Sequence, residues 1–501
     1  MASMRDFIKS VATVLPEIPK PEKKPGLNER LIWTAFALVA YLVMSVTPLC
    51  GFGGHASSTA SSGVCAITSS TGTDQLAFLR VVFASAQGTL MELGIGPIVT
   101  AGLILQLLVG SDIIKLDMSN PEDRSIFGSS TKLLTLIVIV GESFAYIFGG
   151  ALGALRPGQE FVIFIQLFVA SLAVLLLDEM IQKGWGIGSG VSLFILAGVC
   201  QTVMWYTFTP ISVAVSTTTN EIFGFIPAVI SALFSTGFTV TTLANIAVRQ
   251  YRYPSLLTFV LTIAMILVLI YIEGIRVELP ITSTKYRGFQ GVYPIKLLYV
   301  SNIPVILVSA LGANVTFFAR LIQHYQCPAG VCPTGSWINF LGTWPAPVNG
   351  TQSSYPNGGL VYYLTAPQGV DQTIGSPLHS VIYLLYLVGM AVLFARLWVE
   401  IGGLNPKAVA KNLMDADVQV PGFRRTGLSI EQVLNRYIPT LTIIGGVLIG
   451  LIAGVSDLFG VFGSGIGILL MVDIILQDYQ MLLKEQVEEV SPALAGLLGA
   501  G

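Results

Sequence analysis

The chain has 501 residues, of which 53% are hydrophobic and only 11% are charged, and its mean hydropathy is +0.75. Soluble domains carry about 25% charged residues, and a soluble protein with this composition would expose large apolar patches and aggregate. These values exclude a soluble protein and predict one that crosses a membrane several times. The formal net charge of −2 indicates no special partner, because in a membrane protein the positions of the charges carry the information.

The first 30 residues are polar, basic and interrupted by Pro. They lack the apolar core and small-residue cleavage site of a secretory leader, so the first span is expected to act as its own insertion signal. We therefore expect residues 1–30 to form an N-terminal arm on the cytoplasmic side. Within the arm, residues 4–15 fit a short amphipathic helix on the membrane surface and a solvated segment equally well.

Ten apolar runs are long enough to span a bilayer, and all are expected to be helical. Only helices and closed barrels satisfy their backbone in lipid, and the alternating pattern of a barrel is absent. The predicted spans cover residues 31–49, 92–110, 130–150, 160–178, 189–207, 255–273, 298–321, 377–398, 437–455 and 459–483.

The spans divide into an N-terminal half, residues 31–207, and a C-terminal half, residues 255–484. Five spans in each half force the halves into opposite orientations, as in an inverted repeat. The segment 208–254 connects the halves on the outer side. Its apolar stretch 222–234 is too short for an eleventh span and predicts an interfacial helix. Residues 485–501 form the final tail.

Most of the 26 Lys and Arg residues fall on one side of this topology, which predicts that this side, with both termini, is cytoplasmic. Two long basic loops lie there. Residues 273–296 carry alternating Thr, Val, Tyr and Pro and predict an ordered hairpin. Residues 402–436 predict a helix that begins at Asn405-Pro406. Simple topology anchors need only one or two Lys, so the loops favour a docking surface for an acidic partner.

Four cysteines are expected on the outer side, where disulfides can persist. Pairing of Cys50 with Cys65 and of Cys327 with Cys332 is one interpretation, and reduced, unpaired thiols are the other. The C-x4-C spacing without a nearby His disfavours a metal site. Asn349-Gly-Thr in an outer loop matches a glycosylation acceptor.

The sequence offers no catalytic constellation and predicts no enzyme, metal or cofactor. It contains no G-x-x-x-x-G-K-[ST] loop, no H-E-x-x-H and no G-x-S-x-G. Polar groups inside the predicted spans are few: Glu92, Thr100, Gln106, Glu142, Asn302, Asn314 and Asp473. Inverted repeats with broken helices would also suit a secondary transporter of a small solute. Such a transporter needs converging polar groups at the midplane, where this chain places aliphatic residues.

Two features of the glycines need an explanation. The second span opens on Gly94-Ile-Gly-Pro97, which breaks a helix at membrane depth. In addition, "KGWGIGSGVSLFILAG" and "FGSGIGILL" open the fifth and tenth spans, the last of each half. Close helix packing by small residues explains each stretch separately, but it does not explain why they occupy matching places.

At these residues the sequence resembles the SecY family, the protein-conducting channel of the Sec translocon, with the α subunit of the endoplasmic-reticulum translocon as its eukaryotic member. The similar stretches are "LGIGPIVTAGLILQLLVG", "PEDRSIF", "LLLDEMIQKGWGIGSGVSLFI", "RVELPI", "YPIKLLYVSNIPVIL" and "LNRYIP". The resemblance covers nearly the whole chain except the outer insertions 52–74 and 208–254. "GIGPIVTAG", "SDIIKLDMSNPEDR" and "SPALAGLLG" are most similar to the archaeal branch.

The resemblance implies an all-α membrane protein of ten transmembrane helices, in which two inverted five-helix halves surround a central pore. A ring of aliphatic side chains would form the waist: Ile95, Val99, Val191, Ile195, Ile306 and Leu470. A short plug helix would block it from outside, formed by Ala77, Phe78, Leu79, Arg80, Val81, Val82, Phe83, Ala84, Ser85, Ala86 and Gln87. The break at Gly94 would then separate the displaceable plug from the second span.

The resemblance also implies a polar cluster at a lateral gate, formed by Thr100, Glu142 and Asn314, through which hydrophobic segments would enter lipid. The basic loops would dock a ribosome by contacts to rRNA phosphates from Arg276, Lys285, Arg287, Lys407, Lys411, Arg424 and Arg425. Further expected partners are a small single-span SecE or γ subunit, a second small SecG or β subunit, signal sequences and translocating polypeptides. The expected location is the archaeal plasma membrane, or the endoplasmic reticulum if the source is eukaryotic.

Overall fold

The computed structural model describes residues 17–23, 25–49, 83–86, 88–111, 113–114, 116, 121–149, 152, 158–214, 220–234, 247, 249, 253–283, 290–300, 303–327, 336–344, 356–367, 369–415, 418–419 and 427–490. Cys50, Cys65, Cys332 and Asn349 lie outside these residues, as does the stretch 4–15.

Within the described part, nine helices are long and apolar enough to cross a membrane. They are α2 (Leu27–Val46), α5 (Pro121–Phe148), α6 (Gln159–Met180), α7 (Gly190–Phe208), α10 (Leu256–Glu273), α11 (Ile303–Gln326), α15 (Pro377–Ile401), α17 (Gly427–Phe459) and α18 (Gly465–Val490). The shorter apolar helix α4 (Gly96–Gly110) occupies the place of the second span. The ten-span helical architecture is confirmed.

The start of α4 differs from the predicted boundary at residue 92. Gly94 has φ +57°, in the left-handed region, and Pro97 occupies the first turn of the helix. A left-handed residue cannot continue an α-helix, whereas Pro fits the first turn, where its missing N–H costs nothing. The helix therefore begins at Gly96, two residues beyond the break.

The C-terminal spans are longer than their apolar runs. α17 begins at Gly427 and not at residue 437, because its first turns bury Ile430, Leu434 and Ile438 against α16. α18 runs on to Val490 as a mainly polar helix. An apolar window finds only the apolar part of such helices.

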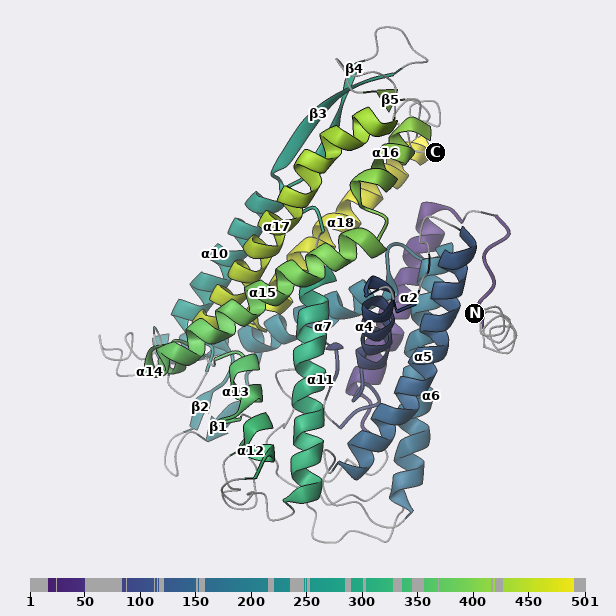
Figure 1. Ribbon diagram of the computed structural model, residues 1–501. Helices are drawn as coiled ribbons and strands as arrows, with labels where there is room; N and C mark the ends of the chain where they lie inside the picture. The colour runs from purple at the N-terminus through teal and green to yellow at the C-terminus, as the bar shows by residue number, and fades with distance from the viewer. Residues whose placement is uncertain are drawn as a thin grey trace.

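Two antiparallel sheets lie at opposite ends of the bundle (Figure 1). At the upper end of that view, β3 (Arg276–Ser283) lies between β4 (Gln290–Lys296) and β5 (Val418–Gln419), with Arg276 opposite Lys296. The hairpin expected over 273–296 is confirmed. α16 (Pro406–Asp415) begins as predicted, and the Asn405 Oδ1 caps it by accepting the Ala408 amide at 2.7 Å.

The lower end carries the second sheet and four short helices. β1 (Ser212–Ala214) pairs with β2 (Asn220–Ile222), and α8 (Phe225–Leu233) follows within the stretch that predicts a helix. The other three helices are α12 (Ile338–Leu341), α13 (Leu360–Leu364) and α14 (Val370–Gly375). Arg320 of α11 lies 5.0 Å from the Trp344 ring and so attaches this layer to a span.

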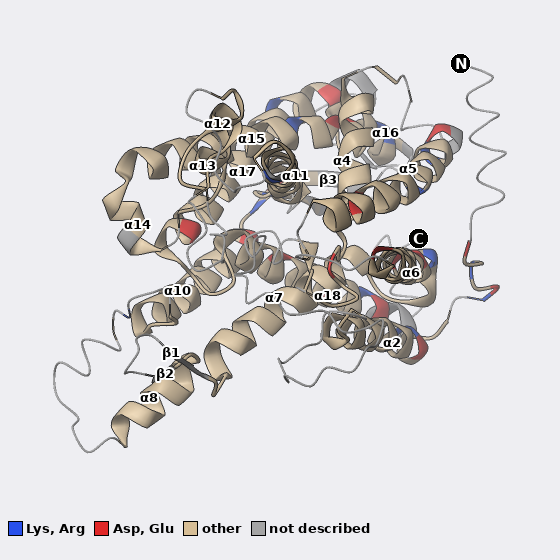
Figure 2. Ribbon diagram, turned by 90° about the horizontal axis from the view of Figure 1, so that it is seen from below, with Lys and Arg blue, Asp and Glu red and all other residues tan. Residues whose placement is uncertain are grey.

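The helices of the N-terminal half, α2 to α7, form one group, and those of the C-terminal half, α10 to α18, form the other. The two groups meet along the centre of the molecule (Figures 1 and 2). α15 and α17 lie side by side in both views. One apolar core joins both groups and contains side chains from α4, α7, α11 and α18. The six residues predicted for the ring lie in or against that core.

Candidate functional site

The six residues predicted for the ring lie in one apolar cluster. Ile95, Ile195 and Leu470 are fully buried in it, at 0% exposure, and Val99, Val191 and Ile306 are partly buried against it. Ile95 directly precedes α4 and Val99 lies near its start, and the others come from α7, α11 and α18. α4 and α7 are the second and fifth spans of the N-terminal half, and α11 and α18 are the second and fifth spans of the C-terminal half. The inverted repeat thus brings equivalent helices to one point.

The end of the predicted plug packs into the same cluster. Phe83 and Ala84 are buried there, and the Phe83 carbonyl accepts the Ile95 amide at 2.8 Å. The Tyr41 hydroxyl of α2 donates to the Ala84 carbonyl at 2.8 Å. A Cβ on Gly94 would come within 2.2 Å of the Phe83 oxygen. The break in the second span therefore places this segment against the apolar cluster. Residues 77–82 and Gln87 lie outside the described part.

The predicted polar cluster also forms. The Asn314 Nδ2 of α11 donates to the Thr100 Oγ1 of α4 at 3.1 Å, and Thr100 is hydrogen-bonded to Glu142 of α5. Tyr146 of α5 stacks on Phe317 of α11, with ring centroids 4.9 Å apart. These contacts join the first half to the second along a seam, which we call the α4–α5/α11 seam.

Two buried carboxylates that sequence reasoning did not single out hold the last helix of each half. Asp178 at the end of α6 accepts the Val191 amide at 2.9 Å. Asp457 near the end of α17 accepts the Gly465 amide at 2.6 Å and the Tyr383 hydroxyl at 2.8 Å. The signal that could have found both was the paired Gly-Ser-Gly, whose last Gly is the first residue of α7 and of α18.

Two further buried carboxyl groups, Glu273 and Asp473, link α10 to α18. Glu273 is hydrogen-bonded to Asp473 and accepts a 3.3 Å bond from the Lys296 Nζ. The two carboxyl groups line a cavity with room for about one water, of about 10 Å³, together with Leu269 and Val472. Asp473 therefore bonds a neighbouring helix.

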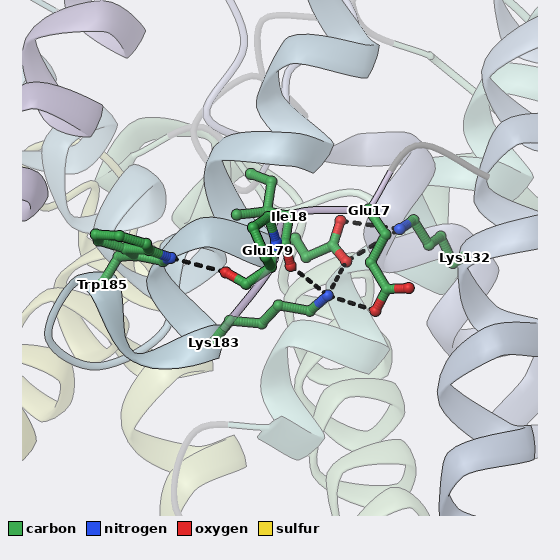
Figure 3. A network of polar contacts seen from close by, with 7 residues as sticks. Glu17, Ile18, Lys132, Glu179, Lys183 and Trp185 are labelled. Atoms are coloured by element: carbon green, nitrogen blue, oxygen red, sulfur yellow. Dashed lines mark hydrogen bonds and ion pairs between the residues drawn. The ribbon is translucent and has the colours of Figure 1, made fainter. Parts of the chain in front are cut away.

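A polar network at the upper end fixes part of the N-terminal arm (Figure 3). Lys183, in the π-helical turn η1 (Ile181–Trp185), contacts Glu17, Glu179 and the Ile18 carbonyl. The Trp185 Nε1 donates to the Pro19 carbonyl at 2.9 Å. The hydrogen bond and positive charge of Lys183 lower the pKa of Glu17 below its ordinary value of 4.5.

Three of the basic docking candidates fall in the described part, and all three are exposed: Arg276 on β3, and Lys407 and Lys411 on α16. Lys285, Arg287, Arg424 and Arg425 lie outside it. Cys327 is disulfide-bonded, while its expected partner lies outside the described residues. No group of three or more His, Cys, Asp or Glu that could hold a metal occurs among the residues described.

Ten spans around a plugged apolar constriction define the class of a membrane channel. Residues 89–479 match the family model of SecY, and residues 39–88 match the model of the plug domain of Sec61p. The chain therefore belongs to the SecY family. It is a protein-conducting channel subunit and not a secondary transporter.

Three relatives support this assignment. The protein transport protein Sec61 subunit alpha of Dictyostelium discoideum is 38% identical over 495 residues, 98% of each chain. A solved protein-conducting channel has a TM-score of 0.77 and 33% identity, covering 97% of this chain and 98% of that one. Sec61 in the canine ribosome–channel complex from the endoplasmic reticulum has a TM-score of 0.75 and 32% identity, with the same coverage. The Dictyostelium relative is eukaryotic, so it does not support the archaeal branch predicted from three motifs.

Proposed function

We propose that this chain forms a gated pore through which secretory polypeptides cross the membrane and from which hydrophobic segments leave sideways into lipid. The observation that supports this proposal is that six aliphatic residues from both halves meet in one apolar cluster. They are Ile95, Val99, Val191, Ile195, Ile306 and Leu470. A narrow aliphatic constriction sheds water and excludes ions, and it offers no polar group that would hold a passing chain. Residues that would otherwise be core then serve as the seal.

The segment Ala77–Gln87 is proposed as the plug of this pore. Its described end is seated by Phe83 in the apolar cluster, and Tyr41 holds the following residue by a single hydrogen bond. The Ile95 amide also bonds the Phe83 carbonyl, and the Ala86 amide bonds the Met91 carbonyl. Each such bond contributes about 0.5–1.5 kcal/mol, so a translocating chain can displace the segment by breaking a few weak bonds. Gly94, with its left-handed backbone, provides the turn between plug and span.

The α4–α5/α11 seam is proposed as the lateral gate. Thr100 bonds both Asn314 and Glu142, so the two halves are joined there by polar contacts. Hydrogen bonds between transmembrane helices average about 0.6 kcal/mol and reach about 1.7. A hydrophobic signal segment that packs between the halves removes its apolar surface from water. The free energy of this transfer offsets the loss of the hydrogen bonds. The seam can therefore open at modest cost.

The upper end is proposed as the cytoplasmic face and the ribosome-docking surface. Arg276, Lys407 and Lys411 are exposed there, and basic side chains bind rRNA phosphates by releasing counterions. The canine relative is described in a ribosome–channel complex. We extend the docking set to Lys285, Arg287, Arg424 and Arg425 of the same loops, and we propose small SecE/γ and SecG/β subunits as further partners.

The proposed organisation follows from this orientation. The arm 1–30 and the tail 485–501 are cytoplasmic, the halves comprise residues 31–207 and 255–484, and the connecting segment 208–254 lies outside. The chain performs no chemistry of its own, because the bound ribosome drives transport. The similarity to the canine relative favours the endoplasmic reticulum as the membrane of this chain. The alternative, an archaeal plasma membrane, is predicted only from three sequence motifs.

Reconstitution tests the function. The full chain, purified with its small subunits, is placed in proteoliposomes and given ribosomes that synthesise a polypeptide with a signal sequence. We expect the polypeptide to become protected from added protease, and a matched polypeptide without a signal to remain accessible. Equal protection of both polypeptides, or of neither, would contradict the proposal.

A further inference from the structure

Asp457 joins three helices of the C-terminal half at one buried point. It lies near the end of α17 and is 5% exposed. One carboxylate oxygen accepts the backbone amide of Gly465, the first residue of α18, at 2.6 Å. The other oxygen accepts the hydroxyl of Tyr383 in α15 at 2.8 Å. A movement of any one of these helices that leaves the others behind would break a charge-assisted hydrogen bond in a buried site.

α15 and α17 are also locked by backbone proximity. A Cβ on Gly450 would lie 2.8 Å from the Cα of Val388, and a Cβ on Gly454 would lie 2.5 Å from a methyl group of Leu384. Small residues at such spacing allow two helices to pack closely. α15 and α17 therefore form one body, and Asp457 lies at the end of it that meets α18.

The two helices linked through Asp457 reach different parts of the channel. α15 packs against α11 of the seam and against the C-terminal end of α4, where a Cβ on Gly110 would lie 3.1 Å from Ile401 and 3.2 Å from Leu397. α18 carries Leu470 of the ring and packs against α7. One end of the linked unit thus borders the lateral gate and the other end borders the pore.

We propose that Asp457 is a positioning residue that transmits movement of α15 at the lateral gate to α18 at the ring. The proposal rests on the proposed function. When α15 moves away from α4 to admit a signal, α17 moves with it, and Asp457 draws the first turn of α18 in the same direction. Leu470 then leaves the ring, so the pore opens because the gate has opened.

Tyr383→Phe removes the hydroxyl that orients the Asp457 carboxylate toward the Gly465 amide, so it weakens the link to α18 while leaving the packing of α15 on α17 in place. The channel with its small subunits is studied in planar bilayers with an added signal peptide, and two quantities are measured: cross-linking of the peptide to α4 and the ion conductance that the peptide triggers. We expect unchanged cross-linking and a conductance per bound peptide lowered on the order of tenfold. A hydrogen bond to a charged group corresponds to about one such step in an equilibrium constant.

Tyr386→Phe is the matched control. Tyr386 lies on the same helix, and its buried hydroxyl has no hydrogen-bond partner among the residues described. We expect both quantities to stay at the wild-type level in this variant. Asp457→Asn should restore most of the conductance lost in Asp457→Ala, because the Asn carbonyl can accept the Gly465 amide and its NH2 can donate to the Tyr383 oxygen.

Three results would overturn the link: unchanged triggered conductance in Tyr383→Phe, an equal fall in Tyr386→Phe, or a parallel fall in cross-linking, which would indicate a merely structural role. The double variant Ile95→Asn, Ile195→Asn is measured in the same bilayers. If it leaks while Tyr383→Phe behaves as wild type, only the link is wrong. If it does not leak, the proposed ring is wrong.

Discussion

The backbone amide of Val191 donates a 2.9 Å hydrogen bond to the carboxylate of Asp178. A residue of the proposed ring is thus held by the last turn of the preceding span. Asp457 does the same for α18 in the other half, through Gly465. A carboxylate at a helix N-terminus satisfies free amides and is favoured by the helix dipole. The pore-lining helices of both halves therefore begin at fixed points.

Polar substitution of the ring should open it to water. We expect Ile95→Asn combined with Ile195→Asn to give a steady ion leak through the resting channel, because both side chains are fully buried in the constriction and an amide there would hold water. Ion flux from proteoliposomes measures the effect. Leu167→Asn, at a buried position in a separate cluster with Leu49 and Ile163, is the control. A flux equal to that of the wild type would remove these residues from the ring.

Gly94→Ala should unseat the plug. Its Cβ would lie 2.2 Å from the Phe83 carbonyl, and the left-handed backbone costs a non-glycine residue about 1–3 kcal/mol. We expect transient ion currents and transport of polypeptides with weaker signal sequences. Single-channel recording and a signal-hydrophobicity series provide the measurements.

Gly102→Ala is its matched control, because a Cβ at that position of α4 meets nothing within 4 Å. It should leave the channel closed. Closed behaviour of Gly94→Ala as well would show that the contact with Phe83 has no part in the seal.

Reversing charge on the docking surface should weaken ribosome binding. We expect Arg276→Glu with Lys407→Glu to lower the affinity and flatten its dependence on salt, since each lost phosphate contact removes counterion release. Co-sedimentation at several salt concentrations measures both quantities. Lys484→Glu, at an exposed position on α18 outside the docking set, should bind as the wild type does. If the double variant keeps both affinity and salt slope, the loops are topology anchors only.

Acid should release the N-terminal arm. The pKa of Glu17 lies below 4.5 because Lys183 bonds and attracts its carboxylate, so the ion pair is complete above pH 4.5 and is lost as the pH falls through the lowered pKa. Glu17 is largely exposed, so we expect a local effect without global unfolding. Proteolysis at the arm, followed against pH with an acid-stable protease, should accelerate below pH 4.5 in the wild type. Glu17→Gln should be cleaved at one rate throughout, and a wild-type profile in that variant would assign the pH dependence to another group.

The sequence by itself determined the local structure. Ten apolar runs, the hairpin at 273–296 and the start of α16 at Pro406 could be predicted because each depends on neighbouring residues: hydrophobic length, alternation and a capping Asn. The resemblance to a family then indicated which aliphatic residues to expect in a ring. Helix ends such as Gly427 were missed, because packing against α16 extends the helix beyond its apolar run.

Only the tertiary structure decided which distant residues meet. Thr100 and Asn314 are 214 positions apart, and the bond between them depends on how α4 packs on α11. Asp457 looks like an ordinary span-end charge until folding brings Tyr383 and Gly465 to its two oxygens. Composition and periodicity describe one helix at a time, whereas these contacts depend on the relative placement of several. The family resemblance implied the polar cluster of the lateral gate, but its contacts, and the link through Asp457, could be described only when the helices were assembled.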